Sequence, residues 1–437
     1  YADNGSAAVE IALKMSFHSF ANRGDSKRTR FVALGNGYHG ETLGALSMGD
    51  LPLYRRVYAP LLLEPIFAPS PDAYEAEPGE SAEAVALRRA DELEAIFAEH
   101  GESICALILE PLVQCAGAMR MHHPAYLRRA REICDRHGAH LIADEIAVGF
   151  GRTGTMFACE QAGIAPDFLC LSKGLTGGFL PMSAVLTTQD VYEAFLSESR
   201  ERGFLHSHSY TGNPLGCAAA LASLAIFDSE PVLERNRTTA ARMAELAAPL
   251  REHPHVADVR QTGMILAIEM AADGRARKPF PATERRGLRA YRAGLERGAV
   301  LRLVVKPLKS EGAEADPAGA PRDANGTLVF ATPSGKVAVR SGDVKLDIVH
   351  VNQTSAMLQR EQIGIEPMTQ LKRVAPARPR SARKSGLEGA AATKDDGRLP
   401  EALRRPVAQR TDLLQPPTAA QAANTLAAMA AMIKGWQ

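Results

Sequence analysis

Three apolar runs in the first half of the chain each lead into a polar residue that could do chemistry. These residues are Glu110 after 104–109, Asp144 after 140–143 and Lys173 after 168–171. Ligands of an open parallel sheet bind beyond the carboxyl ends of its strands. We therefore expect two acids and a lysine to converge at one sheet edge.

Lys173 is the candidate nucleophile of this set. A lysine between an apolar strand and Gly174 is expected to be part-buried, and burial lowers the pKa of an amine by disfavouring its charged form. A neutral amine can form a Schiff base with a carbonyl compound. The alternative is a surface lysine just past a strand.

Asp144 is the candidate partner of a buried positive charge. A carboxylate at the end of a buried strand needs a cation or hydrogen-bond donors. A protonated pyridine nitrogen would satisfy it, and the carboxylate would strengthen that ring as an electron sink. An ordinary helix cap or loop aspartate is the alternative.

Gly5 and Ser6 are candidates for holding a phosphate. They open an amphipathic helix with Val9, Leu13 and Phe17 on one face. Backbone N–H groups at a helix start bind phosphate, and a serine adds a hydroxyl donor. A plain serine helix cap is the alternative.

Tyr38 lies two residues before Gly40 and directly after Gly37, so its ring could lie flat against a heteroaromatic cofactor. A turn with a surface tyrosine is the alternative. Residues 206–214 are rich in hydroxyls and could supply further phosphate donors, or could be only a polar loop. A phosphate grip, a stacking ring, a carboxylate and a Schiff-base lysine together make a pyridoxal phosphate (PLP) site.

These residues need a scaffold that alternates strands and helices. Helices are predicted at 81–101 and 125–137 among the apolar runs, which indicates an α/β fold with a mostly parallel sheet flanked by helices. Residues 228–303 predict a smaller α/β unit. It has a helix at 231–252 and strands at 256–260, 265–270 and 300–303.

The composition of the 437 residues is that of a globular protein, with 46% hydrophobic and 23% charged residues and a net charge of +1. That balance gives no reason to expect nucleic acid or a membrane as partner. The six cysteines form no CxxC pair and are expected to be buried free thiols in a reducing compartment. No apolar stretch reaches the ~18 residues of a membrane span. No signal peptide is evident and Tyr1 is not a methionine, so we expect a cytoplasmic protein whose natural N-terminus is missing.

Composition changes abruptly near residue 303. Residues 1–303 have a net charge of −5, whereas 304–437 have +6 and contain 2 of the 24 aromatic residues. Within the latter, 327–351 alternate like strands and 413–437 could form a helix. The basic stretch 372–384 is predicted to be a linker, and nucleic-acid binding is the alternative.

The segment Asp144–Gly154, followed by Pro166-Asp167 and Ser172-Lys173-Gly174, resembles the class III (subgroup II) PLP-dependent aminotransferases. The resemblance extends from residue 1 to about residue 303. It implies a fold-type I homodimer with its sites at the subunit interface, no nucleic acid or membrane partner, and no metal.

The same resemblance implies a role for each candidate residue. Lys173 would hold the cofactor covalently and later move a proton, Asp144 would pair with the pyridinium nitrogen, and Tyr38 would stack on the ring. Gly5, Ser6 and Ser209 of the partner subunit would hold the phosphate, and Glu110 would orient the ring. Tyr38, Lys173, Ser207 and Arg302 would meet substrate, with Arg302 binding its carboxylate.

Four further segments resemble the members of the family that act in biotin synthesis. The segments are 38–47, 110–114, 119–124 and 157–160. Those members transfer an amino group from S-adenosylmethionine to 8-amino-7-oxononanoate, giving 7,8-diaminononanoate. Lysine as donor, and an aminotransferase for an ω-amino acid or diamine, are the enzymatic alternatives.

The expected domains are a PLP-binding domain, N-terminally truncated, at 1–227, a partial small domain at 228–303, and an unrelated or rearranged tail at 304–437. The family continues beyond Arg302 with a proline-containing loop, which Leu303 to Lys306 do not match. A truncated or chimeric product without activity is therefore a further alternative.

Overall fold

The computed structural model describes residues 1–295, 301–305 and 326–331. All described residues belong to one compact unit. The predicted linker at 372–384 and the predicted helix at 413–437 lie outside them.

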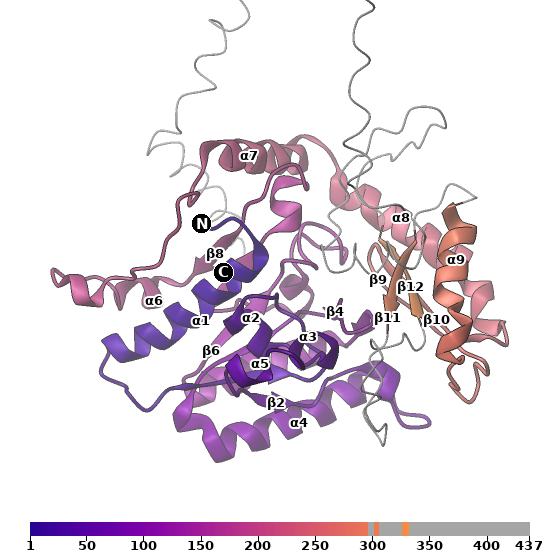
Figure 1. Ribbon diagram of the computed structural model, residues 1–437, viewed down its shortest axis with the longest axis horizontal. Coiled ribbons are helices and arrows are strands. Elements are labelled where there is room, and N and C mark those ends of the chain that lie inside the picture. The colour runs from indigo at the N-terminus through magenta and orange to yellow at the C-terminus, as the bar shows by residue number, and fades with distance from the viewer. Residues whose placement is uncertain (296–300, 306–325, 332–437) are drawn as a thin grey trace, which may run out of the picture. The chain divides into compact units, whose positions relative to one another are not determined.

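A six-stranded sheet with the order β2-β1-β3-β6-β7-β8 positions the candidate residues (Figure 1). Its strands are β1 (Arg30–Leu34), β2 (Ile66–Ala68), β3 (Ile104–Leu109), β6 (His140–Asp144), β7 (Phe168–Leu171) and β8 (Ala184–Thr187). Neighbouring strands are parallel except for β7 and β8, which confirms the predicted mostly parallel sheet. Because β3, β6 and β7 are neighbours, the residues that follow them lie at one sheet edge.

Alternate side chains of each strand face opposite sides of the sheet, and each side is covered by helices. Ala106 and Ile108 of β3 join a buried cluster with Val9 and Leu13 of α1 (Gly5–Asn22). Because their side chains are buried on both faces of the sheet, β3 and β7 are apolar along their whole length.

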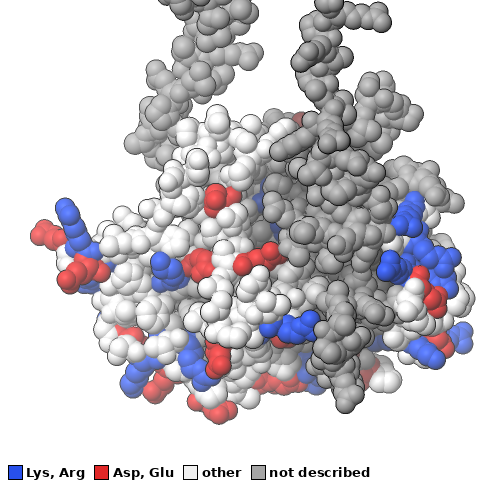
Figure 2. Space-filling view, in the orientation of Figure 1, with Lys and Arg blue, Asp and Glu red and all other residues white. Residues whose placement is uncertain are grey.

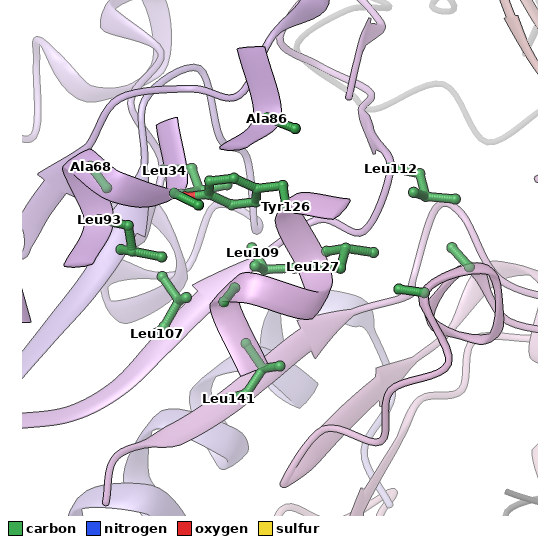
Figure 3. Packing of buried hydrophobic residues seen from close by; sticks show 14 of the residues in the cluster. Leu34, Ala68, Ala86, Leu93, Leu107, Leu109, Leu112, Tyr126, Leu127 and Leu141 are labelled. Carbon is green, nitrogen blue, oxygen red and sulfur yellow. The ribbon is translucent and has the colours of Figure 1, made fainter. Parts of the chain in front are cut away.

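The opposite face packs on α4 (Ala82–His100) and α5 (Pro124–His137). Leu107 and Leu109 of β3 meet Leu93 of α4 and Leu127 of α5 there (Figure 3). This cluster anchors β3, the strand that ends immediately before Glu110.

A second sheet has the order β11-β12-β10-β9 and is antiparallel throughout. Its strands are β9 (Val256–Thr262), β10 (Ile265–Met270), β11 (Arg302–Val305) and β12 (Gly326–Ala331). Two helices accompany it, α8 (Val232–Ala247) and α9 (Arg286–Leu295). Ala247 of α8 packs with Val259, Leu266 and Ile268 of the sheet.

Shorter elements connect these parts. They are α2 (Leu43–Met48), α3 (Pro52–Arg55), α6 (Gln189–Glu193), α7 (Pro214–Ser229), the paired strands β4 (Val113–Gln114) and β5 (Arg120–Met121), and 3-10 helices that include η2 (Ala73–Glu75), η4 (Ala158–Ala162) and η5 (Lys173–Thr176).

Most predicted elements agree with the structure. The strand expected at 265–270 is β10, and residues 327–331 of the alternating stretch 327–351 belong to β12. The remainder of that stretch, 332–351, lies outside the described residues. The expected strand at 300–303 begins at Arg302 in the described residues. The division at residues 227 and 303 stays a prediction.

The predicted buried face of α1 was wrong in one position. Phe17 is 43% exposed, whereas Val9, Leu13 and Phe20 are buried. Phe20 packs beside His140 of β6, so the helix turns this side to the sheet and leaves Phe17 outside it. The prediction of free thiols is confirmed, since all six cysteines are free and five of them are buried.

The described surface shown in Figure 2 carries acidic and basic side chains side by side. Among the described residues, no one helix has the length and apolarity to cross a membrane. Helix α7 and the stretch Val232–Glu252, bent by 75° at their junction, meet that test only when taken together.

Candidate active site

Asp144, the last residue of β6, is held in one orientation by two hydrogen bonds. Its Oδ2 lies 2.8 Å from His39 Nδ1, and its Oδ1 accepts from the backbone N–H of Ile146 at 3.1 Å. Both side chains are buried, with 5% of Asp144 and 0% of His39 exposed. A buried carboxylate in this position can balance a positive charge brought by a ligand.

Glu110 follows β3 and joins two loops. Its carboxylate accepts from the backbone N–H of Tyr38 at 3.1 Å and from that of Cys115 at 3.0 Å. Burial raises the pKa of Glu110 to about 7, although His39 nearby acts in the opposite direction. Glu110 therefore fixes the segment that presents Tyr38 and His39.

The start of α1 lies directly against this segment. Ser6 Oγ accepts from the backbone N–H of Glu41 at 3.1 Å. Gly40 has a φ of +129°, and a Cβ added to it would lie 2.1 Å from Ser6 Oγ. Only glycine permits this approach, so Gly5 and Ser6 are brought beside the Tyr38 segment as expected for one site.

The Tyr38 ring is half-buried at the border of this group. Its Oη donates to Glu41 Oε1 at 2.9 Å, and its ring centroid lies 5.3 Å from that of Tyr54. Burial raises the pKa of the Tyr38 hydroxyl well above its ordinary range, and Glu41 adds to this effect. The side chain is thus a neutral aromatic surface with a fixed hydroxyl.

Lys173 follows β7 in a strained backbone conformation. Its φ is +42°, which residues with a side chain adopt rarely, and such strain concentrates at functional sites. Gly174 allows the turn, because a Cβ there would lie 2.7 Å from the Phe150 ring. The predicted partial burial of Lys173 was wrong. Lys173 is exposed.

Glu145 has different hydrogen-bond partners from its neighbour Asp144, and these contacts stabilise the fold. Its carboxylate accepts from the backbone N–H groups of Ala158 at 3.0 Å and Cys159 at 2.8 Å, at the start of η4. It is completely buried, and burial raises its pKa to about 7. The two adjacent acids therefore do different work, Asp144 toward the candidate site and Glu145 toward the loop before η4.

Three predicted site residues lie on other segments of the chain. Ser207 and Ser209 are in an exposed loop before α7. Arg302 lies on β11 of the second sheet, where its backbone pairs with Val329. Their predicted contacts with phosphate and substrate stay predictions.

Comparison with known proteins agrees with this geometry. Residues 1–316 match the family model described as aminotransferase class-III. The chain belongs to the class III aminotransferase family. The match spans well over half of the sequence and includes each candidate residue, from Gly5 to Arg302.

Class III relatives with curated names share the chain's first three hundred residues. Proteins named adenosylmethionine-8-amino-7-oxononanoate aminotransferase are 46% identical over 305 residues in Nitratidesulfovibrio vulgaris, 45% over 304 in Geobacter sulfurreducens and 45% over 309 in Helicobacter pylori. Each match covers 69% of this chain. The chain spans 56% of the length of the first relative and 67% of the other two.

Solved class III structures have the same fold. The aminotransferase of that name from Methanocaldococcus jannaschii is 34% identical with a TM-score of 0.66, covering 76% of this chain and 69% of its own. A PLP-bound amine transaminase from an uncultivated Pseudomonas species is 33% identical with a TM-score of 0.68, covering 76% and 71%. The aminotransferase fold is therefore established for the described residues.

His39 is a buried partner of Asp144 that sequence reasoning missed. It lies beside Tyr38, which drew attention for its ring, and its own contact with Asp144 joins positions 105 residues apart. Its Nε2 is buried and has no hydrogen-bond partner in the described residues. The signal available was a histidine next to a glycine in a segment already suspected of binding a cofactor.

Proposed function

We propose that this chain is a PLP-dependent aminotransferase that transfers an amino group from S-adenosylmethionine to 8-amino-7-oxononanoate. The observation that carries the proposal is the meeting of Glu110, Asp144 and Lys173 at the ends of three adjacent strands. The curated relatives, named for this reaction, support the choice of substrates at 42–46% identity. The product would be 7,8-diaminononanoate.

The residues present fit PLP group by group. The buried Asp144 carboxylate suits the protonated ring nitrogen, and the half-buried Tyr38 ring offers an apolar surface to the pyridine. The close approach of Gly40 to Ser6 leaves the start of α1, with Gly5, to bind the phosphate. Lys173 lies at the end of the strand next to β6, with its side chain accessible.

Bound PLP supplies an electron sink for negative charge that develops on a substrate carbon. The chain's own residues orient and assist. Lys173 Nζ would hold the cofactor and move a proton to and from that carbon. Asp144, fixed by His39, would keep the ring nitrogen protonated, and Glu110 would hold the Tyr38 segment against the ring.

Substrate recognition is assigned to residues outside this group. Arg302 presents a planar guanidinium, which binds a carboxylate through two parallel hydrogen bonds. Ser207 would contribute a polar contact to the substrate from its exposed loop. These roles rest on the family resemblance and on the placement of Arg302 on a regular strand.

A homodimer would complete the site. Phe179, Leu205 and Tyr210 are 87%, 84% and 70% exposed. Large apolar side chains exposed in this number mark an interface with another chain. The loop of Leu205 and Tyr210 also carries Ser209, which in a dimer would reach the phosphate bound by the partner subunit. We also propose a cytoplasmic location, as expected for a biosynthetic enzyme.

Transfer to an ω-amino acid or diamine is the competing function, because an amine transaminase matches the fold as well as the M. jannaschii enzyme does. The deciding experiment incubates the full chain with PLP and 8-amino-7-oxononanoate. S-adenosylmethionine, lysine and an ω-amino acid are offered as donors in parallel, and products are identified by mass spectrometry. We expect 7,8-diaminononanoate with S-adenosylmethionine. The same product from lysine alone would identify lysine as the amino donor in place of S-adenosylmethionine. Absence of product with every donor would contradict the proposal.

A further inference from the structure

Five buried or part-buried charged residues join the second sheet to the loops beside the first. Asp72 and Arg120 come from the segments around η2 and β5, and Asp258, Arg260 and Glu269 come from β9 and β10. We call these five residues the junction cluster. Arg120 belongs to the segment 119–124, one of the four that resemble the biotin-pathway members of the family.

Arg120 makes the central contacts of the junction cluster. Its two terminal nitrogens donate to the two oxygens of Glu269 at 3.0 and 3.3 Å, and its Nε lies 3.2 Å from Asp72 Oδ2. Its guanidinium also lies 3.9 Å from the centre of the Tyr74 ring. Every side of this guanidinium is thus engaged by groups from two different parts of the fold.

Arg260 completes the junction cluster from the sheet side. It lies 2.8 Å from both Glu269 and Asp258, and it donates to the backbone carbonyl oxygens of Ala118 at 2.6 Å and Met119 at 2.8 Å. The last two contacts bind β9 to the chain just before β5. Glu269 is therefore shared by one arginine from each side of the junction.

Ordered contacts of this kind fix orientation. Arg120, Asp72 and Glu269 are each less than 10% exposed. Buried charges tolerate loss of a partner poorly, and a two-pronged contact between arginine and carboxylate permits little sliding or rotation. An apolar contact of equal area would define the orientation of the second sheet less specifically.

The strand register connects the junction cluster to Arg302. Arg302 pairs with Val329, Val329 with Ala267, and Ala267 with Arg260, so Arg302 and Arg260 occupy one row across the four strands. Glu269, Thr327 and Val304 form the second row along, with the row of Ile268, Leu328 and Leu303 between them. The two arginines are separated by three strand spacings, about 14 Å at about 4.8 Å each.

We propose that Arg120, Arg260 and Glu269 are positioning residues that set the place of Arg302 against the PLP-binding strand ends, and so determine how well the substrate carboxylate is bound. This inference rests on the proposed function. Hydrogen bonds across β9, β10, β12 and β11 pass the constraint from the junction cluster to Arg302. The binding of PLP itself, at the ends of β3, β6 and β7, does not depend on it.

The test compares Glu269→Gln with the unmodified full chain in two half-reactions. We expect the KM for 8-amino-7-oxononanoate to rise about tenfold or more while kcat changes less than about threefold. PLP absorbance and the rate with S-adenosylmethionine should stay unchanged, and Glu269→Asp should recover part of the affinity. A rise in KM for both substrates, or no rise in either, would overturn the proposal.

Asp167→Asn is the matched control, because Asp167 pairs with Arg131 at 2.7 Å within the six-stranded sheet region. It should lower stability without changing the KM for 8-amino-7-oxononanoate. Arg120→Lys keeps the charge but loses the two-pronged contact, and it carries the same test should Glu269→Gln not fold.

Hydrogen exchange gives a readout without cofactor or substrate. In Glu269→Gln the amides of 265–270 and 302–305 should exchange about tenfold faster, while those of 104–109 and 140–144 keep their rates. Uniform change across both sheets would overturn the proposal. No transfer by the unmodified chain would contradict the proposed function alone, because the exchange comparison stands without it.

Discussion

The proposed function gives different tasks to two regions of the molecule. One region is the strand ends of the six-stranded sheet, and the other is the four-stranded sheet as a whole. The strand ends bring Glu110, Asp144 and Lys173 together because three parallel strands are neighbours. The four-stranded sheet carries Arg302 on β11, which pairs with β12 at 21 to 27 residues along the chain, and β12 pairs with β10 at 58 to 66 residues. We propose that its place also depends on the junction cluster. The proposed function thus assigns the chemistry to the strand ends and the binding of the substrate carboxylate to the four-stranded sheet.

This difference predicts two kinds of mutational effect. Changes at the strand ends should impair PLP binding and both half-reactions together. Changes on the four-stranded sheet should separate one substrate from the other. The following four changes test that division.

Replacement of Lys173 by alanine should have the largest effect. Without the amine no covalent link to PLP can form, so amino-group transfer should fall by roughly 10⁴-fold or more in both half-reactions. Product formation followed by mass spectrometry measures the loss. Retained transfer with either substrate would remove Lys173 from the centre of the site.

Replacement of Arg302 by alanine should distinguish the two regions most clearly. The half-reaction with 8-amino-7-oxononanoate should weaken by about 100-fold in kcat/KM, the value of charge-assisted hydrogen bonds to a carboxylate. The S-adenosylmethionine half-reaction should weaken much less, and PLP absorbance should not change. Equal losses in both half-reactions would argue against the assigned role.

Glu145→Gln should change stability with pH and leave transfer intact. Burial raises the pKa of Glu145 from 4.5 to about 7, so the folded chain keeps a proton that the unfolded chain has already released between those values. Raising the pH through this window therefore costs the wild type folding free energy. Because glutamine does not titrate, the variant should gain about 3 kcal/mol relative to wild type between about pH 4.5 and pH 8. Urea unfolding of both proteins across this range measures it, and a pH-independent difference would refute it.

Gly40→Ala should show a smaller effect confined to PLP binding. The new Cβ would meet Ser6 Oγ, so the start of α1 should be displaced and PLP affinity should fall about tenfold. Gly79→Ala is the matched control, because Gly79 also has a positive φ, +85°, but a Cβ there meets nothing within 4 Å. Absorbance titration with PLP measures both. Equal losses of affinity in the two variants would show that backbone strain alone is responsible.

The strand-end residues could be predicted because their signal is local. Each follows a short apolar run, and the order of strands and helices implies parallel pairing. The same reasoning fails where orientation matters. It predicted a part-buried Lys173, but Lys173 is exposed and has a positive φ, and Gly174 packs closely against Phe150; none of these features has a local sequence signal.

Contacts between distant segments could not be predicted from one sequence. His39 meets Asp144 across 105 residues, and Arg120 meets Glu269 across 149. The positions of His39 and Arg120 in the sequence give no indication of such distant partners. The different roles of Asp144 and Glu145 could also be assigned only from the fold, because both acids follow the same apolar run.

The most direct test of the central claim is to locate the covalent attachment of PLP. The purified full chain is incubated with PLP, reduced with borohydride, digested, and mapped by mass spectrometry. We predict that the reduced cofactor is attached to Lys173, beside the strand that ends in Asp144. An adduct on another lysine, or none at all, would contradict the assignment of these strand ends as the PLP site.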